Sequence, residues 1–119
     1  YIQYAHARLC SIFTQWDGDE ANLNKADLAL LTSPYELAVA AKLSEFAEVI
    51  ESAARELAPH AVAFYLKDLA AEFHSYYNAE RMLVDDVALK EARIALAGAV
   101  RQVIRNGLAI LGVSCPQSM

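Results

Sequence analysis

The chain has 119 residues, of which 56% are hydrophobic and 9% aromatic, and a formal net charge of −5. This length suffices for one domain with a single modest core. Much of the hydrophobic content is alanine, which favours close-packed helices over a β-sandwich. The acidic balance argues against nucleic-acid binding on bulk charge alone, because such domains are usually basic.

The charge is spread unevenly along the chain. Residues 1–58 contain four basic and nine acidic residues, whereas residues 59–119 contain six of each. Beyond Glu91 the chain has Arg93, Arg101 and Arg105 but no acid. An anionic partner is therefore expected to contact the second half of the chain.

Cysteine usage and apolar runs indicate the cellular setting. Cys10 and Cys115 lack CxxC spacing, and the three histidines lack metal-ligand spacing, so we expect no disulfide framework and no metal site. No apolar run approaches the roughly 20 residues that cross a bilayer, and no signal peptide opens the chain. We expect a cytoplasmic protein without a membrane partner. Because Tyr1 stands where an initiator Met would, we also expect a fragment of a larger protein.

Apolar residues recur at helical spacing through the chain, without strand-like alternation or repeats. The first expected elements are a helix over residues 2–13, a turn over 16–20 and a short helix over 25–31. The clearest helix start follows at Ser33-Pro34-Tyr35-Glu36, where Ser33 caps, Pro34 suits the first position and Glu36 completes a capping box. The apolar stripe of this helix comprises Val39, Leu43, Phe46, Ile50, Ala53 and Leu57.

Two further long helices are expected. Pro59 restarts the chain, and one stripe then comprises Val62, Leu66, Leu69, Phe73 and Tyr76. After a connection over residues 78–84, the last helix opens near Asp85 and Asp86, and Gly107 either ends it or marks a close helix contact. The prediction is one all-α domain over residues 1–119, a helical bundle of about four to five helices.

No catalytic centre is expected from sequence motifs. The chain contains no GxSxG, P-loop or GxGxxG motif. Carboxylate pairs such as Glu48 and Glu51 fall on the outer, acidic face of an expected helix. We interpret that face as a solvated surface.

Aromatic residues gather between positions 65 and 77. Tyr65 and Tyr77 lie on different sides of the apolar stripe, so both cannot be fully buried. Exposed rings beside basic groups stack on nucleotide bases, worth roughly 1–3 kcal/mol each. The alternative for Tyr77 is a half-buried hydroxyl at a helix end.

The late arginines form a second candidate surface. Arg93, Arg101 and Arg105 are separated by eight and four residues, which places them within a sector of roughly 120° on a helix. This arrangement predicts a strip that contacts phosphates without reading sequence. The alternative is a solubilising outer face.

Three blocks of the chain together resemble the C-terminal region of arginyl-tRNA synthetases, the all-helical anticodon-binding module known as the DALR domain. The blocks are Tyr1-Ile-Gln-Tyr-Ala-His-Ala-Arg8, the set Pro59-His60…Tyr65-Leu66…Phe73-His74…Tyr77-Asn78, and Arg105-Asn-Gly-Leu-Ala-Ile-Leu-Gly-Val-Ser-Cys-Pro-Gln-Ser-Met119. The letters DALR are not intact, and Lys90-Glu-Ala-Arg93 stands in the comparable region.

The resemblance implies a class I ligase that joins arginine to tRNA(Arg) at the expense of ATP. Its catalytic Rossmann domain, with ATP and magnesium, would precede Tyr1, so this fragment would be inactive alone and need no cofactor. The fragment would bind the anticodon stem-loop as a monomer attached to the catalytic domain.

The resemblance also implies tRNA-binding residues. Tyr65 and Tyr77 would contact bases, and Met119 would pack on one. Arg101 and Arg105 would bind phosphates. Further candidates are His60 and Asn78.

Three other interpretations of the sequence remain open. The first is a helical protein–protein docking module that uses the acidic first half. The second is a stand-alone bundle enzyme or ligand carrier. The third is the equivalent domain of the glycyl-tRNA synthetase β-subunit.

Overall fold

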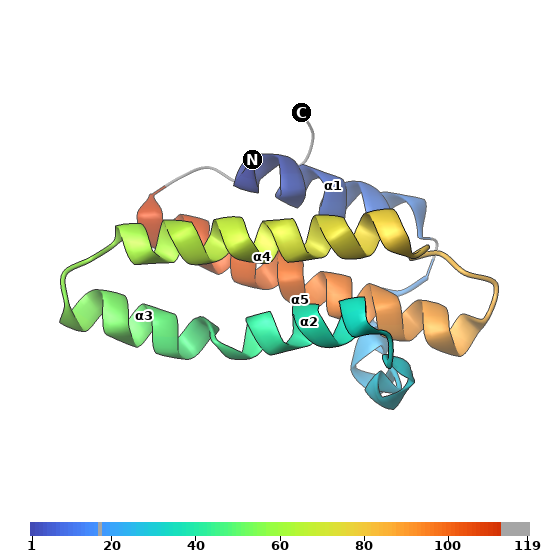
Figure 1. The fold of residues 1–119 in the computed structure, drawn as a ribbon. Coiled ribbons are helices and arrows are strands. Elements are labelled where there is room, and N and C mark those ends of the chain that lie inside the picture. Colours follow the sequence, from blue (N-terminus) through green and yellow to red (C-terminus); the bar gives the residue numbers. More distant parts are fainter. Residues whose placement is uncertain (17, 113–119) are drawn as a thin grey trace.

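A computed structural model of the chain describes residues 1–16 and 18–112, which form five α-helices and two short 3-10 helices (Figure 1). The elements are α1 Ile2–Gln15, η1 Glu20–Lys25, η2 Leu28–Leu30, α2 Pro34–Ser44, α3 Phe46–Arg55, α4 His60–Ala79 and α5 Val87–Leu111. The all-α bundle expected from the sequence is confirmed.

Helix α4 is the centre of the bundle. It packs against α1, α2, α3 and α5, with α1 on one side and the α2–α3 pair on the other (Figure 1). The predicted stripe of α4 is buried throughout, and its largest members, Phe73 and Tyr76, are fully inaccessible to solvent. These two side chains belong to the same hydrophobic core as Leu9 of α1 and Ile94 and Ile104 of α5.

The predicted helix over residues 34–57 is interrupted at Glu45, which separates α2 from α3. The hydroxyl of Tyr65 donates a hydrogen bond to the carbonyl oxygen of Lys42 at 2.5 Å, and the Glu45 amide donates to the same oxygen at 3.2 Å. In a continuous helix that carbonyl would accept from Phe46. The Tyr65 hydroxyl therefore takes the place of a backbone donor in the helical hydrogen-bond pattern and breaks the helix. Insertion of a side chain into this pattern is a known cause of helix kinks.

Leu57 was expected to complete the buried stripe of this helix, and that expectation is wrong. Leu57 is 89% exposed and adopts a left-handed φ of 53°. The Ala58 amide donates to the Ala53 carbonyl at 2.9 Å, the six-residue closure of a helix-terminating motif. Chain reversal before α4 turns Leu57 away from the core.

The segment between α1 and α2 differs from its prediction. The structure has two 3-10 turns where a turn and one short helix over residues 25–31 were expected. Asp19 and Asp27 each cap one turn, accepting hydrogen bonds from the amides of Ala21 and Ala29. Local side-chain capping favours these short turns over a longer helix.

Helix α5 runs past Gly107 and ends at Gly112, whose φ is 72°. At Gly107 an added Cβ would lie 2.6 Å from Cδ1 of the fully buried Leu66. Of the two predicted roles for Gly107, the close helix contact is therefore confirmed. Gly112 supplies the left-handed end of the helix.

By length and composition α5 is the one helix among the described residues that is long and apolar enough to cross a membrane. Its inner face includes buried Ile94, Val100 and Ile104. Helix α5 also packs against α1, α2 and α4. We interpret it as the core helix of the bundle.

Replacing Gly107 with alanine should destabilise the chain by about 1–3 kcal/mol, because the new methyl group would overpack the α4–α5 contact. Gly98→Ala is the matched control. There an added Cβ would meet only the ring of Phe13, with Cζ at 3.2 Å and Cε2 at 3.9 Å, and the better helix propensity of alanine offsets the contact. Urea unfolding of the two variants measures the difference, and equal stabilities would contradict the close α4–α5 packing.

Candidate nucleic-acid interface

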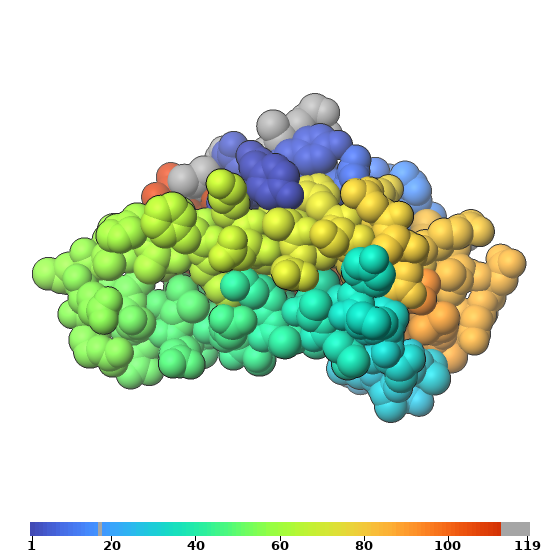
Figure 2. Space-filling view, in the orientation of Figure 1, coloured from blue at the N-terminus to red at the C-terminus, as the bar shows by residue number. Residues whose placement is uncertain are grey.

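Exposed tyrosines surround one arginine where α1 lies over the middle of α4. Figure 2 shows the start of α1 (blue) on α4 (yellow). The residues are Tyr1, which precedes α1, Tyr4 and Arg8 of α1, and Tyr77 of α4; they are here called the tyrosine–arginine face. The three tyrosines are 61%, 46% and 37% exposed. Planar rings are thus available to solvent on both sides of a guanidinium group.

Arg8 is held between two rings of this face. Its guanidinium carbon lies 5.1 Å from the ring centre of Tyr4 and 4.6 Å from that of Tyr77. Its Nη2 also donates to the Tyr4 hydroxyl at 2.7 Å. Cation–π contacts of this kind order the arginine while leaving it charged.

His74 forms the floor of the face. Its ring centre lies 5.3 Å from that of Tyr1 and 5.8 Å from that of Tyr4. Its Nε2 is buried without a hydrogen-bond partner among the described residues. Burial, reinforced by the charge of Arg8, lowers the pKa of His74 below its ordinary value. The imidazole is therefore neutral at neutral pH and serves as an apolar platform.

A groove lies beside the face, at the end of α4. It has a volume of about 370 Å³, here called the Tyr77 groove. Its lining residues are Ile12, Gln15, Tyr77, Asn78, Ala79, Glu80, Arg81, Met82 and Leu83. The groove combines an aromatic ring, an amide side chain and the backbone of the α4–α5 loop, which are groups that bind a planar, polar-edged ligand.

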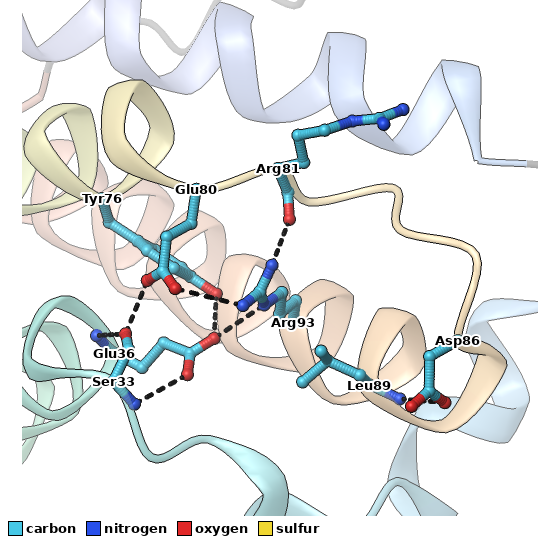
Figure 3. Close-up of polar contacts among 8 residues, drawn as sticks. All are labelled: Ser33, Glu36, Tyr76, Glu80, Arg81, Asp86, Leu89 and Arg93. Atoms are coloured by element: carbon cyan, nitrogen blue, oxygen red, sulfur yellow. Dashed lines mark hydrogen bonds and ion pairs between the residues drawn. The ribbon is translucent and has the colours of Figure 1, made fainter.

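A buried polar network lies behind the loop that lines this groove (Figure 3). We call it the Arg93 network; its members are Ser33, Glu36, Tyr76, Glu80 and Arg93. Glu36 Oε2 accepts from Tyr76 at 2.7 Å and from Arg93 Nε at 2.8 Å. Glu80 accepts from Ser33 Oγ at 2.5 Å and from Arg93 Nη2 at 3.2 Å. The network joins α2, α4 and α5.

The ionisation of Glu36 follows from these contacts. Burial alone would raise the pKa of Glu36, which is only 2% exposed. Hydrogen bonds from Tyr76, the Ser33 amide and Arg93 outweigh burial and lower that pKa below its ordinary value. Burial and the bond to Glu36 raise the pKa of Tyr76. The network is thus a charged Glu–Arg pair with a neutral tyrosine.

The predicted capping box is confirmed within this network. Ser33 Oγ accepts from the Glu36 amide, and Glu36 Oε1 accepts from the Ser33 amide, both at 3.1 Å. The same glutamate therefore caps α2 with one oxygen and binds Arg93 with the other. The sequence analysis did not predict that Glu36 joins α2 to α5.

The late arginines do not form the open strip that their spacing predicted. Arg93 belongs to the network and is only 11% exposed at its side chain. Arg101 Nη2 donates to Glu20 at 2.8 Å, and its guanidinium lies 3.8 Å above the ring centre of Phe13. Arg105 Nε donates to Nε2 of the buried His6 at 2.8 Å. The phosphate contacts predicted for Arg101 and Arg105 stay predictions, and each of these arginines already has an internal partner.

The other predicted site residues fall in different places. Tyr77 borders the face and the groove, and the exposed Asn78 lines the groove. Tyr65, predicted to contact a base, is buried at 4% exposure, where its ring stacks on Phe46. Burial, with the charge of Glu45, raises the pKa of Tyr65 to about 12.

Two predicted residues lie away from this surface. His60 is exposed at the start of α4, its ring edge against Phe64, some 25 Å along the helix from Tyr77 at about 1.5 Å per residue. Met119 lies outside the described residues.

Sequence reasoning missed Tyr1, Tyr4 and Arg8 as site residues. A signal was present, because spacings of three and four residues place all three on one side of a helix. The buried Ala5, Leu9 and Ile12 lie directly beside this stripe on the helix. An aromatic and basic stripe along the edge of a core face would have identified the candidates.

The structure places no group of three His, Cys, Asp or Glu side chains, among its described residues, where they would hold a metal ion. The features it does present are a helical bundle and exposed tyrosines around an arginine. These are features of helical domains that bind nucleic acids.

Comparison with known proteins identifies the family. The sequence profile of the DALR anticodon binding domain matches residues 2–119. The chain belongs to this family.

Two relatives and two solved structures illustrate the match. The whole chain is 71% identical to part of an arginine–tRNA ligase of Dechloromonas aromatica and 64% identical to part of one of Janthinobacterium sp. (strain Marseille). It also aligns over its whole length with arginyl-tRNA synthetase of Thermus thermophilus, at a TM-score of 0.85 and 36% identity. A putative arginyl-tRNA synthetase of Campylobacter jejuni gives a TM-score of 0.89 and 27% identity.

The chain is much shorter than these proteins. It spans 20% and 21% of the two ligases, and 21% and 26% of the two structures. The resemblance to arginyl-tRNA synthetases is confirmed. These matches favour the arginyl assignment over the glycyl β-subunit alternative.

Acidification should destabilise the chain partly through His74. Its pKa is lowered in the folded state, so the unfolded chain binds this proton more readily, and stability is lost as the pH falls through about 6.5. His74→Phe keeps a ring and removes the titration. Urea unfolding at pH 7.5 and 5.5 should show a smaller loss in the variant than in the original chain. Equal losses would show that His74 titrates alike in both states.

Proposed function

We propose that this domain binds the anticodon stem-loop of tRNA(Arg) for an arginyl-tRNA synthetase. The observation that carries the proposal is the tyrosine–arginine face beside the Tyr77 groove, in a chain of the DALR anticodon binding domain family. The parent enzyme would join arginine to tRNA with ATP and magnesium in its catalytic domain. This domain would add specificity and no catalytic residue of its own.

The chemistry of loop recognition supports this surface. Proteins read single-stranded RNA loops by splaying out bases, stacking them on aromatic rings and hydrogen-bonding their edges. Tyr1, Tyr4 and Tyr77 offer rings, and Arg8 offers a charged plane for a phosphate or base. The Asn78 amide and the loop backbone line a groove large enough for one base.

The distribution of acidic residues also supports RNA binding at the tyrosine–arginine face. The glutamates of the first half that are exposed include Glu45, Glu48, Glu51 and Glu56, at and around α3. Helix α3 lies on the opposite side of α4 from α1 (Figure 1). A polyanion that approaches the tyrosine–arginine face would therefore keep away from this acidic surface, although the whole chain carries a charge of −5.

Not every predicted residue enters this proposal. Tyr65 takes no part, because its ring is buried and its hydroxyl is bonded to Lys42. Met119 stays a predicted base contact from the family resemblance.

We also propose that the parent is a soluble, cytoplasmic monomer, as expected from the sequence.

Tyr77→Ala and Arg8→Ala, each made in the full-length synthetase, should raise the KM for tRNA(Arg) roughly tenfold, the loss of one stacking or charged contact. The kcat and the KM values for ATP and arginine should stay unchanged, because the catalytic domain is untouched. Aminoacylation kinetics measures all four quantities. Arg8→Ala should also weaken the salt dependence of tRNA binding.

Tyr35→Ala is the matched control. Tyr35 is a 45% exposed tyrosine of α2, on the other side of α4 from α1. It should leave the KM for tRNA unchanged. An equal KM increase in Tyr35→Ala and Tyr77→Ala would mean that the tyrosine–arginine face is not the RNA surface, and the docking-module alternative would then gain weight.

A further inference from the structure

We propose that Arg93 is a positioning residue for RNA binding, which holds the α4–α5 loop so that the Tyr77 groove is formed before RNA arrives. The inference rests on the proposed function. Arg93 lines neither the groove nor the tyrosine–arginine face, and its side chain is almost entirely buried. It would act through the backbone that it binds.

The contact that carries this inference is to the loop itself. Arg93 Nη1 donates a hydrogen bond to the backbone carbonyl of Arg81 at 2.5 Å (Figure 3). Arg81 and its neighbours Met82 and Leu83 form one wall of the Tyr77 groove. A largely buried residue near the start of α5 is thus bonded directly to the groove wall.

The α4–α5 loop forms few hydrogen bonds that would hold it in place. Helix α4 ends with the Glu80 amide bonded to the Tyr76 carbonyl, and α5 begins with Asp86 capping the amides of Ala88 and Leu89. Between these ends, at residues 81–85, the bond from Arg93 is the one hydrogen bond formed with the described part of the chain. The buried side chain of Met82 and the partly buried Leu83, which packs against the core, supply the other anchors.

The guanidinium shape makes this tether specific to arginine. Its three nitrogens bond in three directions, with Nε on Glu36, Nη2 on Glu80 and Nη1 on the Arg81 carbonyl. A lysine carries the same charge on a single nitrogen and cannot match this planar fork. Arg93→Lys therefore keeps a cation between the two glutamates while it removes the bond to the loop.

The test compares the full-length synthetase with its Arg93→Lys variant. In aminoacylation, the KM for tRNA(Arg) should rise roughly tenfold, with kcat and the KM values for ATP and arginine unchanged. Trypsin should also cleave the variant sooner after the exposed Arg81, which precedes the buried Met82.

Val39→Ala is the control for general destabilisation, because Val39 is fully buried in α2 and lies outside the network and the groove. It should lower the melting temperature without faster trypsin cleavage after Arg81 and without a change in the KM for tRNA. If Val39→Ala reproduces both effects of Arg93→Lys, the positioning role is overturned in favour of a purely structural one.

Three other results would also overturn the inference, and they separate it from the proposed function. Unchanged trypsin cleavage after Arg81 in Arg93→Lys would mean that the tether does not hold the loop. Faster cleavage with an unchanged KM for tRNA, while Tyr77→Ala raises that KM, would leave the proposed function standing and show that the loop does not matter to RNA. An unchanged KM in Tyr77→Ala itself would remove the RNA site, and the inference with it.

Discussion

The ion pair between Arg93 and Glu36 is the interaction on which the arrangement of α2, α4 and α5 depends. Both side chains are almost completely buried, at 11% and 2% exposure, so each charge requires the other. Removal of one partner from such a pair typically costs about 3–5 kcal/mol, because the remaining charge is left without compensation. The tyrosine of α4, the capping box of α2 and the end of α4 all bond to these two groups. Three helices and one loop are therefore placed by one polar centre.

The pairing of the arginines also bears on the proposed contact between this acidic domain and RNA. Arg93 and Arg101 are neutralised by glutamates from distant parts of the chain, and Arg105 bonds to a buried histidine. These arginines stabilise the bundle. Arg8 differs, because aromatic rings and a hydroxyl hold it without a carboxylate partner among the described residues. Its charge stays available on the side of the bundle that lies away from α3.

Much of the fold was predictable because its signals are local. The capping box at Ser33, the helix start near Asp85 and Asp86 and the buried stripe of α4 follow from neighbouring residues, and the structure confirms them. The break at Glu45 was not predictable, because it is caused by the hydroxyl of Tyr65, a side chain twenty residues further along. The candidate site was predicted only in part: Tyr77 and Asn78 border the groove, whereas Tyr65 is in the core. Helical spacing alone did not show which side of α4 is covered by α1 and which by α2.

The sequence by itself determined most of the helices, the capping box at Ser33, the all-α class and the family resemblance, since each depends on contacts within a few residues or on matching motifs. Only the tertiary structure decided which charged and aromatic side chains are free. The arginines of α5 looked unpaired because no acid follows Glu91, yet their partners come from residues 6, 20, 36 and 80. The physical reason is that charge pairing and burial depend on distance in space. Spacing along the chain reports that distance only within a single helix.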